Sequence, residues 1–159
     1  LASEGTIRRI GRGLYDYPGK SEYLGEKLPP DIDQAAQAIA RKHCWIIAPE
    51  GSIAANMLGL SQQVPAKLVY LSDGPSRKIK VGDQEITFRH ASPKDLRMEH
   101  YSSRLVVQAL RCLGKEHVDR KVIALLRRKL PQLDKARLLE DIRYGTDWIL
   151  EVARKIAGA

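Results

Sequence analysis

The spacing of apolar residues predicts that the chain's first well-defined elements are a helix, a short strand and a second helix. Between positions 33 and 43, apolar side chains recur every three or four residues, and Asp31 or Asp33 can cap this first helix. The short Trp-Ile-Ile run that follows is typical of a buried strand, and a Pro-Glu-Gly turn ends it. A second helix begins after Ser52, which can cap it, and ends at Gly59.

Three strand signals come next. The runs at positions 67–72, 77–81 and 85–90 contain β-branched and aromatic residues, and the last two alternate apolar with polar side chains. Short turns separate them, with Asp-Gly-Pro before the second run and Gly-Asp before the third. This stretch, from about 67 to 90, therefore predicts a small antiparallel β-meander with one buried and one solvated face.

The remainder of the chain, from about 102 to 157, predicts a helical bundle. Ser102 or Ser103 can cap an amphipathic helix that reaches Gly114. A second apolar pattern runs from about 118 to 130 and is closed by a proline; a last one spans about 138 to 156, with a break at Gly145-Thr146. Both tryptophans, at positions 45 and 148, sit in apolar patterns, so we expect them to be mainly core residues.

The first 20 residues predict a β-hairpin, because two short β-leaning runs flank the glycines at positions 11 and 13. So short a hairpin is not stable alone and must pack against other elements. A polar stretch up to Pro29-Pro30 is typical of a linker. The whole pattern predicts an α+β protein: the hairpin, then over residues 31–159 a mixed domain with the meander and the C-terminal helical bundle.

Charge makes an anionic partner the first hypothesis. The chain has 27 Lys and Arg against 19 Asp and Glu, a net charge of +8. Arginines crowd the hairpin, and hairpin tips can contact phosphates, so the expected DNA-binding residues are Arg8, Arg9, Arg12 and Lys20. Arg77, Lys78 and Lys80 form a second candidate basic surface. Residues 93–159 hold fifteen basic and nine acidic side chains, a pattern that a solvated helical surface also explains.

Other chemistry is less well supported by the sequence. Cys44 and Cys112 lack the spacing of a zinc site, so we expect no metal and expect both thiols to pack as small apolar groups. No nucleophile elbow and no phosphate-binding loop occurs, so no cofactor is expected. No apolar run approaches the ~18 residues of a membrane span, and hence no membrane partner is expected. Few cysteines and no leader-like start favour the cytoplasm.

Two alternatives to DNA binding stay open. A metal-dependent nuclease would need converging carboxylates near a lysine, and Asp73, Asp83 and Glu85 occur close in sequence to Lys80. A protein-interaction module would instead use its basic C-terminal helices to hold an acidic partner, without binding DNA.

Three runs of sequence carry a family resemblance. The run TIRRIGRGLYDYP resembles the wing that ends an N-terminal winged helix-turn-helix. The run PEGSIAANMLGLSQQVPAKLVYLSDGPSRKIKVGDQEITFRHASPKDL resembles the central part of the AbiEi-like antitoxin and regulator family of bacterial type IV toxin–antitoxin systems, and SSRLVVQALRCLGKE continues that pattern. The resemblance covers most of the chain.

The resemblance implies a non-enzymatic antitoxin that also represses its own operon. Its N-terminal winged helix would bind operator DNA, and its C-terminal domain would neutralise a nucleotidyltransferase-like toxin, directly or indirectly. Arg8, Arg9 and Arg12 fall on the wing, whereas Arg77, Lys78 and Lys80 fall on a basic strand of the C-terminal domain. Only three residues precede the wing's first turn, so the resemblance implies a truncated winged helix whose recognition helix lies upstream.

Overall fold

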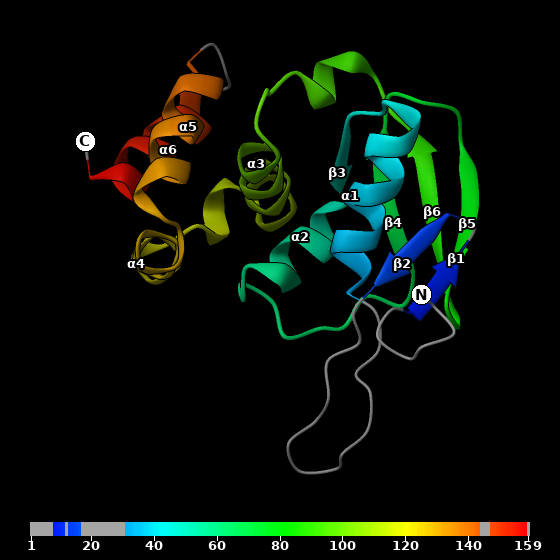
Figure 1. The fold of residues 1–159 in the computed structure, drawn as a ribbon. Coiled ribbons are helices and arrows are strands. Elements are labelled where there is room, and N and C mark those ends of the chain that lie inside the picture. Colours follow the sequence, from blue (N-terminus) through cyan, green and yellow to red (C-terminus); the bar gives the residue numbers. More distant parts are fainter. Residues whose placement is uncertain (1–7, 12, 17–30, 144–146, 159) are drawn as a thin grey trace.

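The computed structural model describes residues 8–11, 13–16, 31–143 and 147–158 (Figure 1). Within these ranges it has six α-helices, a two-stranded sheet and a four-stranded sheet, so the predicted α+β class is confirmed. The predictions that fall on Arg12, Lys20 and the break at Gly145-Thr146 lie outside the described residues. Among the described helices, none has the length and apolar character that crossing a membrane requires.

The larger sheet is mixed, with the strand order β3-β4-β6-β5. Its strands are β3 (Ile47–Pro49), β4 (Leu68–Ser72), β5 (Arg77–Val81) and β6 (Gln84–His90). The predicted antiparallel meander is therefore wrong in its pairing: β4 lies beside β6 and runs parallel to it, and β5 is an edge strand. Strands β4 and β6, which carry the buried Tyr70, Ile86 and Phe88, take the centre, while the Arg- and Lys-rich β5 takes the edge, where charged side chains stay solvated.

Helix α1 (Ile32–His43) covers one face of this sheet (Figure 1). Asp31 caps the helix as predicted, since its carboxylate accepts a hydrogen bond from the backbone N–H of Gln34 at 3.1 Å. The helix buries small residues and one isoleucine, and this lets it approach the sheet closely. Its core partners on the strands are large: Tyr70, Ile86 and Phe88 are all fully buried.

Helices α2 (Gly51–Met57) and α3 (Tyr101–Leu113) pack closely against each other. Gly51 permits this contact, because a Cβ there would lie 2.7 Å from the Cβ of Cys112. The predicted caps are wrong at both helices: Glu50 precedes α2 without a side-chain cap, and α3 begins at Tyr101 rather than after a serine. Gly59, with a φ of +74°, ends α2 as predicted, and the next residue's N–H bonds back to Ala55.

The C-terminal region contains three further helices: α4 (Arg120–Lys129), α5 (Gln132–Asp141) and α6 (Asp147–Ala157). The predicted helix from 118 to 130 is confirmed as α4, but α5 begins at Gln132, before the predicted start near 138. These helices share an apolar core with α2 and α3. Trp148 packs partly buried against that core and Trp45 against the core under α1, as expected of both.

Candidate functional site

The predicted DNA-binding hairpin is present as a two-stranded antiparallel sheet. Strand β1 (Arg8–Gly11) pairs with β2 (Leu14–Asp16), with Arg8 opposite Asp16. The hairpin lies between α1 and the edge strand β5 (Figure 1). Near its tip, a Cβ on Gly13 would lie 3.1 Å from the Nζ of Lys42, in the basic last turn of α1. The tertiary structure thus places the hairpin backbone beside two other basic segments, the end of α1 and β5.

Strand alternation separates the three residues of the second predicted basic surface. The Arg77 guanidinium stacks over the indole of Trp45, 5.7 Å from the ring centroid, on the side of the sheet that carries α1. Lys78 and Lys80 are opposite Thr87 and Glu85 of β6 and belong to the other face. The three residues therefore form two different basic regions rather than one.

Lys78 lies in a shallow groove of about 670 Å³ on that other face of the sheet. The segment before β4 forms one wall of the groove, where Val64 is 85% exposed. Lys67 and Arg89 add two further cations, against the single carboxylate of Glu85. The sequence did not single out Lys67 or Arg89, which the pairing of β4 with β6 brings into one groove.

The loop between β4 and β5 is built around Trp45. The backbone N–H of Ile46 donates to the Asp73 carboxylate at 2.8 Å, and the Asp73 N–H donates to the Ile46 carbonyl at 3.1 Å. The indole of Trp45 lies directly against Gly74 and stacks on His43 with ring centroids 4.5 Å apart. The predicted Asp-Gly-Pro turn is therefore confirmed as a structural loop between β4 and β5.

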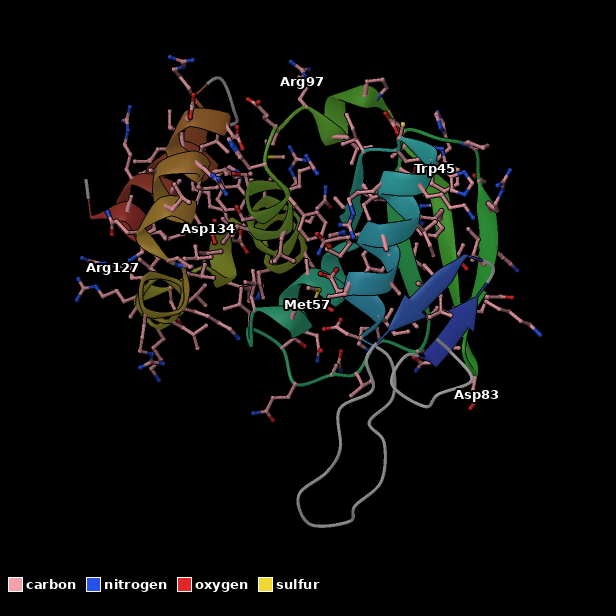
Figure 2. The ribbon with its side chains drawn as sticks, viewed as in Figure 1. Trp45, Met57, Asp83, Arg97, Arg127 and Asp134 are labelled. Atoms are coloured by element: carbon pink, nitrogen blue, oxygen red, sulfur yellow. The ribbon has the colours of Figure 1, made fainter. Side chains whose placement is uncertain are left out.

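The residues of the predicted nuclease do not converge. Glu85 is the cross-strand neighbour of Lys80, and Asp83 lies in the adjoining turn between β5 and β6. Asp73 follows the far end of β4, at the opposite end of the sheet from Asp83, which Figure 2 labels. In the described ranges, no group of three or more His, Cys, Asp or Glu side chains has the arrangement of a metal site.

Both cysteines differ from the prediction. Cys44 ends α1 in the left-handed conformation, with a φ of 57°, and Cys112 lies near the end of α3. Both thiols are free and exposed instead of packing in the core. The reason is positional, since each follows the last buried turn of its helix.

A carboxylate shared by two tyrosines joins α1, β4 and α3. The hydroxyl of Tyr70 donates to Asp33 Oδ1 at 2.8 Å, and the hydroxyl of Tyr101 donates to the same oxygen. Gln37 donates to the other oxygen at 2.8 Å. Burial, followed by the proximity of Asp33, raises the pKa of both tyrosines well above the usual range. Both hydroxyls therefore remain donors at any physiological pH.

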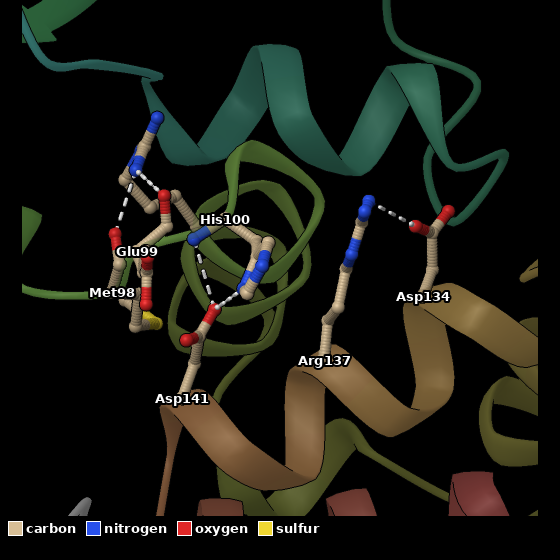
Figure 3. A network of polar contacts seen from close by, with 7 residues as sticks. Met98, Glu99, His100, Asp134, Arg137 and Asp141 are labelled. Atoms are coloured by element: carbon tan, nitrogen blue, oxygen red, sulfur yellow. Dashed lines mark hydrogen bonds and ion pairs between the residues drawn. The ribbon is translucent and has the colours of Figure 1, made fainter.

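Arg104 is the most buried cation among the described residues, at 8% exposure. Its Nε donates to the Ile47 carbonyl at 2.8 Å, and its Nη1 donates to the carbonyls of Met98 and Glu99 at 2.6 and 3.1 Å. Figure 3 shows the two Nη1 bonds at the start of α3. Burial lowers its pKa, but three backbone oxygens hold the cation in place. Arg104 thus connects the sheet to the helical region and is structural.

Asp141, at the end of α5, supplies the cap that α3 lacks. Its Oδ2 accepts from the backbone N–H and from the ring Nδ1 of His100, each at 3.0 Å (Figure 3). Burial by itself would raise the pKa of Asp141, but the nearby Ser103 hydroxyl and the hydrogen bonds from His100 outweigh it, and the pKa is lowered. A carboxylate from a distant helix therefore fixes the start of α3.

We expect Asp141→Asn to cost about 1–2 kcal/mol of unfolding free energy at pH 7, because the side chain is 4% exposed and loses charge-assisted hydrogen bonds. A carboxylate whose folded pKa is lowered stabilises the protein above its ordinary pKa of about 4, and this contribution disappears as pH falls through the folded pKa. The difference in unfolding free energy between wild type and variant should therefore be largest at pH 7 and shrink below about pH 4.

Urea unfolding at pH 7, 5 and 3 measures this difference. Asp134→Asn is the matched control on the same helix, since Asp134 makes only a loose ion pair with Arg137 at 3.8 Å (Figure 3). That variant should change stability by less than about 0.5 kcal/mol. An Asp141→Asn deficit that stays constant from pH 7 to 3 would contradict the assigned role of the carboxylate.

Taken together, the fold and its charged surfaces define an α+β protein with a basic hairpin and a basic sheet edge. The chain belongs to DUF6088, a family of unknown function, whose sequence model matches residues 1–138. The matched region extends from the hairpin into α5, and α6 lies beyond it. No curated protein and no solved structure gives a significant match.

Proposed function

We propose that this protein is a DNA-binding antitoxin and autorepressor of its own operon, acting in the cytoplasm. The observation that carries the proposal is the position of the hairpin: the backbone of β1, which contains Arg8 and Arg9, lies beside β5, and Gly13 at the tip lies near Lys42. Three basic segments from distant parts of the sequence thus meet in one region. The order of the wing-like, central and helical motifs supports the same function.

The proposed DNA binding by the hairpin has an electrostatic basis. Duplex DNA carries one phosphate charge per ~1.7 Å of its axis, and cations that neutralise phosphates release bound counterions. A two-stranded hairpin with arginines can reach the backbone of a groove, as wings do, and so positions the protein without reading bases. The remaining domain, residues 31–159, then provides the surface that neutralises a nucleotidyltransferase-like toxin, directly or indirectly.

We expect replacement of Arg8, Arg9 and Arg12 by alanine to weaken DNA binding by a similar factor on all sequences. Phosphate contacts contribute equally to the affinity for every DNA sequence. Each lost contact reduces the magnitude of the slope of log K against log salt concentration by about 1. Fluorescence anisotropy across a salt series, on the upstream duplex and a scrambled duplex, measures both quantities.

The matched control replaces three exposed cations outside the hairpin, Arg97, Lys115 and Arg154, by alanine. It removes the same charge and should leave the salt slope within about 0.5 of wild type. A hairpin variant that keeps its affinity but prefers different sequences would contradict backbone contact.

Neutralisation is tested separately, by coexpression with the neighbouring nucleotidyltransferase-like protein and measurement of growth. Restored growth supports the antitoxin proposal. If the protein neither binds its upstream DNA nor restores growth, the antitoxin proposal is excluded.

A further inference from the structure

Helix α4 concentrates positive charge in a short segment of the chain. Its ten residues include five cations and no acid, and all five cations are exposed. They are Arg120, Lys121, Arg127, Arg128 and Lys129. Lys129 donates a hydrogen bond from its Nζ to the Met57 carbonyl at 3.3 Å. In the part of the chain that the structure describes, the other four make no ion pair with an acid.

The position of two of these cations argues against a role in helix stability. Arg127 and Arg128 lie in the last turn of α4, where cations interact favourably with the helix dipole. Arg120 and Lys121 lie in the first turn, where the same dipole disfavours positive charge, and that turn contains no acid. Their presence therefore points to something outside the helix.

Two of the five cations, Arg120 and Arg127, line an open depression of about 670 Å³ between α4 and the end of α6. Ile123, Ala124 and Gly158 are its apolar and small lining residues. Arg120, Arg127 and Lys155 are its charged lining residues. The guanidinium of Arg127, which Figure 2 labels, lies beside the end of α6, since a Cβ on Gly158 would be 3.4 Å from its Nη2. The site thus combines an apolar centre with a basic rim.

We propose that this depression binds an acidic amphipathic helix of a partner protein. Arg120 and Arg127 are seven residues apart, which is about 10.5 Å along α4, the same rise as two turns of a partner helix. Carboxylates at positions i and i+7 of that helix would meet the two arginines, and an apolar residue between them would cover Ile123 and Ala124.

Nucleic acid fits this site less well. Single-stranded nucleic acid is held by aromatic platforms together with cations, and none of the lining residues is aromatic. An apolar centre offers nothing to a phosphate, but it does favour a leucine or isoleucine side chain. The inference does not depend on the proposed antitoxin function, because the hairpin lies beside β5 and the depression lies between α4 and α6.

The test uses the full chain and a fluorescein-labelled helical peptide of about 18 residues, with glutamates seven positions apart and leucines between them. The same peptide with lysine in place of glutamate is the first control, and a duplex DNA of random sequence is the competing ligand. Anisotropy titrations compare wild type with Arg120→Glu/Arg127→Glu and with the matched variant Lys121→Glu/Arg128→Glu. The matched variant also inverts two positive charges on α4, but Lys121 and Arg128 do not line the depression.

We expect the acidic peptide to bind wild type and the lysine peptide not to bind. Arg120→Glu/Arg127→Glu should weaken binding by at least about tenfold, and Lys121→Glu/Arg128→Glu by less than about threefold. Equal weakening by both variants would show general charge attraction and overturn the site. The site would also be overturned if the acidic peptide did not bind, or if Arg120→Glu/Arg127→Glu lost binding to DNA but not to the peptide. Circular dichroism of each variant establishes that it is folded.

Discussion

Gly74→Ala is expected to destabilise the protein by about 2–3 kcal/mol, as overpacking of a filled site does. The added Cβ would lie 2.3 Å from Nε1 of Trp45 and 2.5 Å from two of its ring carbons. The indole has little room to retreat, because it packs on His43 and Phe88 and carries Arg77 on its face. The backbone of the loop must move instead, which strains the hydrogen bonds between Asp73 and Ile46.

A double-mutant cycle tests this cause. In a Trp45→Ala background the indole is gone, so Gly74→Ala should cost less than about 0.5 kcal/mol. Urea unfolding followed by far-UV circular dichroism gives the four free energies without relying on tryptophan fluorescence. If Gly74→Ala costs the same in both backgrounds, then the contact with Trp45 is not the reason for glycine at this position.

Arg104→Leu is expected to cost about 3–4 kcal/mol, the other large effect. The variant removes the guanidinium that donates to three backbone carbonyls, those of Ile47, Met98 and Glu99, and the bonds to Ile47 and Met98 are buried. Buried acceptors that lose a charged donor keep the full cost of their desolvation. Arg104→Lys should recover only part of the loss, since one ammonium group cannot reproduce the geometry of the guanidinium.

Equilibrium unfolding in urea at pH 7 measures these changes. Arg97→Leu is the control, because Arg97 is an exposed cation a few residues earlier in the chain (Figure 2), and it should change stability by less than about 0.5 kcal/mol. Hydrogen exchange adds a second readout: the amides of β3 and of the first turn of α3 should lose protection together in Arg104→Leu. A cost below about 1 kcal/mol would show that Arg104 is replaceable.

Gly74 and Arg104 lie in the runs that carry the resemblance to AbiEi-like proteins. Gly74 belongs to the SDGPSR segment and Arg104 to SSRLVV, and Gly59, in LGLSQQVPA, ends α2 with a positive φ. All three positions have a structural reason in this fold. These motif residues therefore have structural roles, whereas function has to be tested at the hairpin and at the basic surfaces.

Local patterns predicted most of the elements, because they depend on neighbours within a few residues. The period of apolar positions located α1 and α4, and both begin after an aspartate whose side chain caps the helix, Asp31 and Asp119. The apolar pattern does not mark the start of α5, because Pro131 both follows α4 and directly precedes α5. The caps of α2 and α3 were also missed, because α3 is capped by Asp141, 41 residues from His100.

The sequence by itself determined the α+β class, the order of the elements and the excess of positive charge. Only the tertiary structure decided that β6 lies between β4 and β5, that Arg77 faces Trp45 while Lys78 faces the groove, and that the hairpin lies beside β5. Hydrophobic periodicity records which side of an element is buried, but many partners can bury the same face. Strand order and the meeting of distant cations depend on which long-range packing has the lowest free energy, and no local pattern encodes that choice.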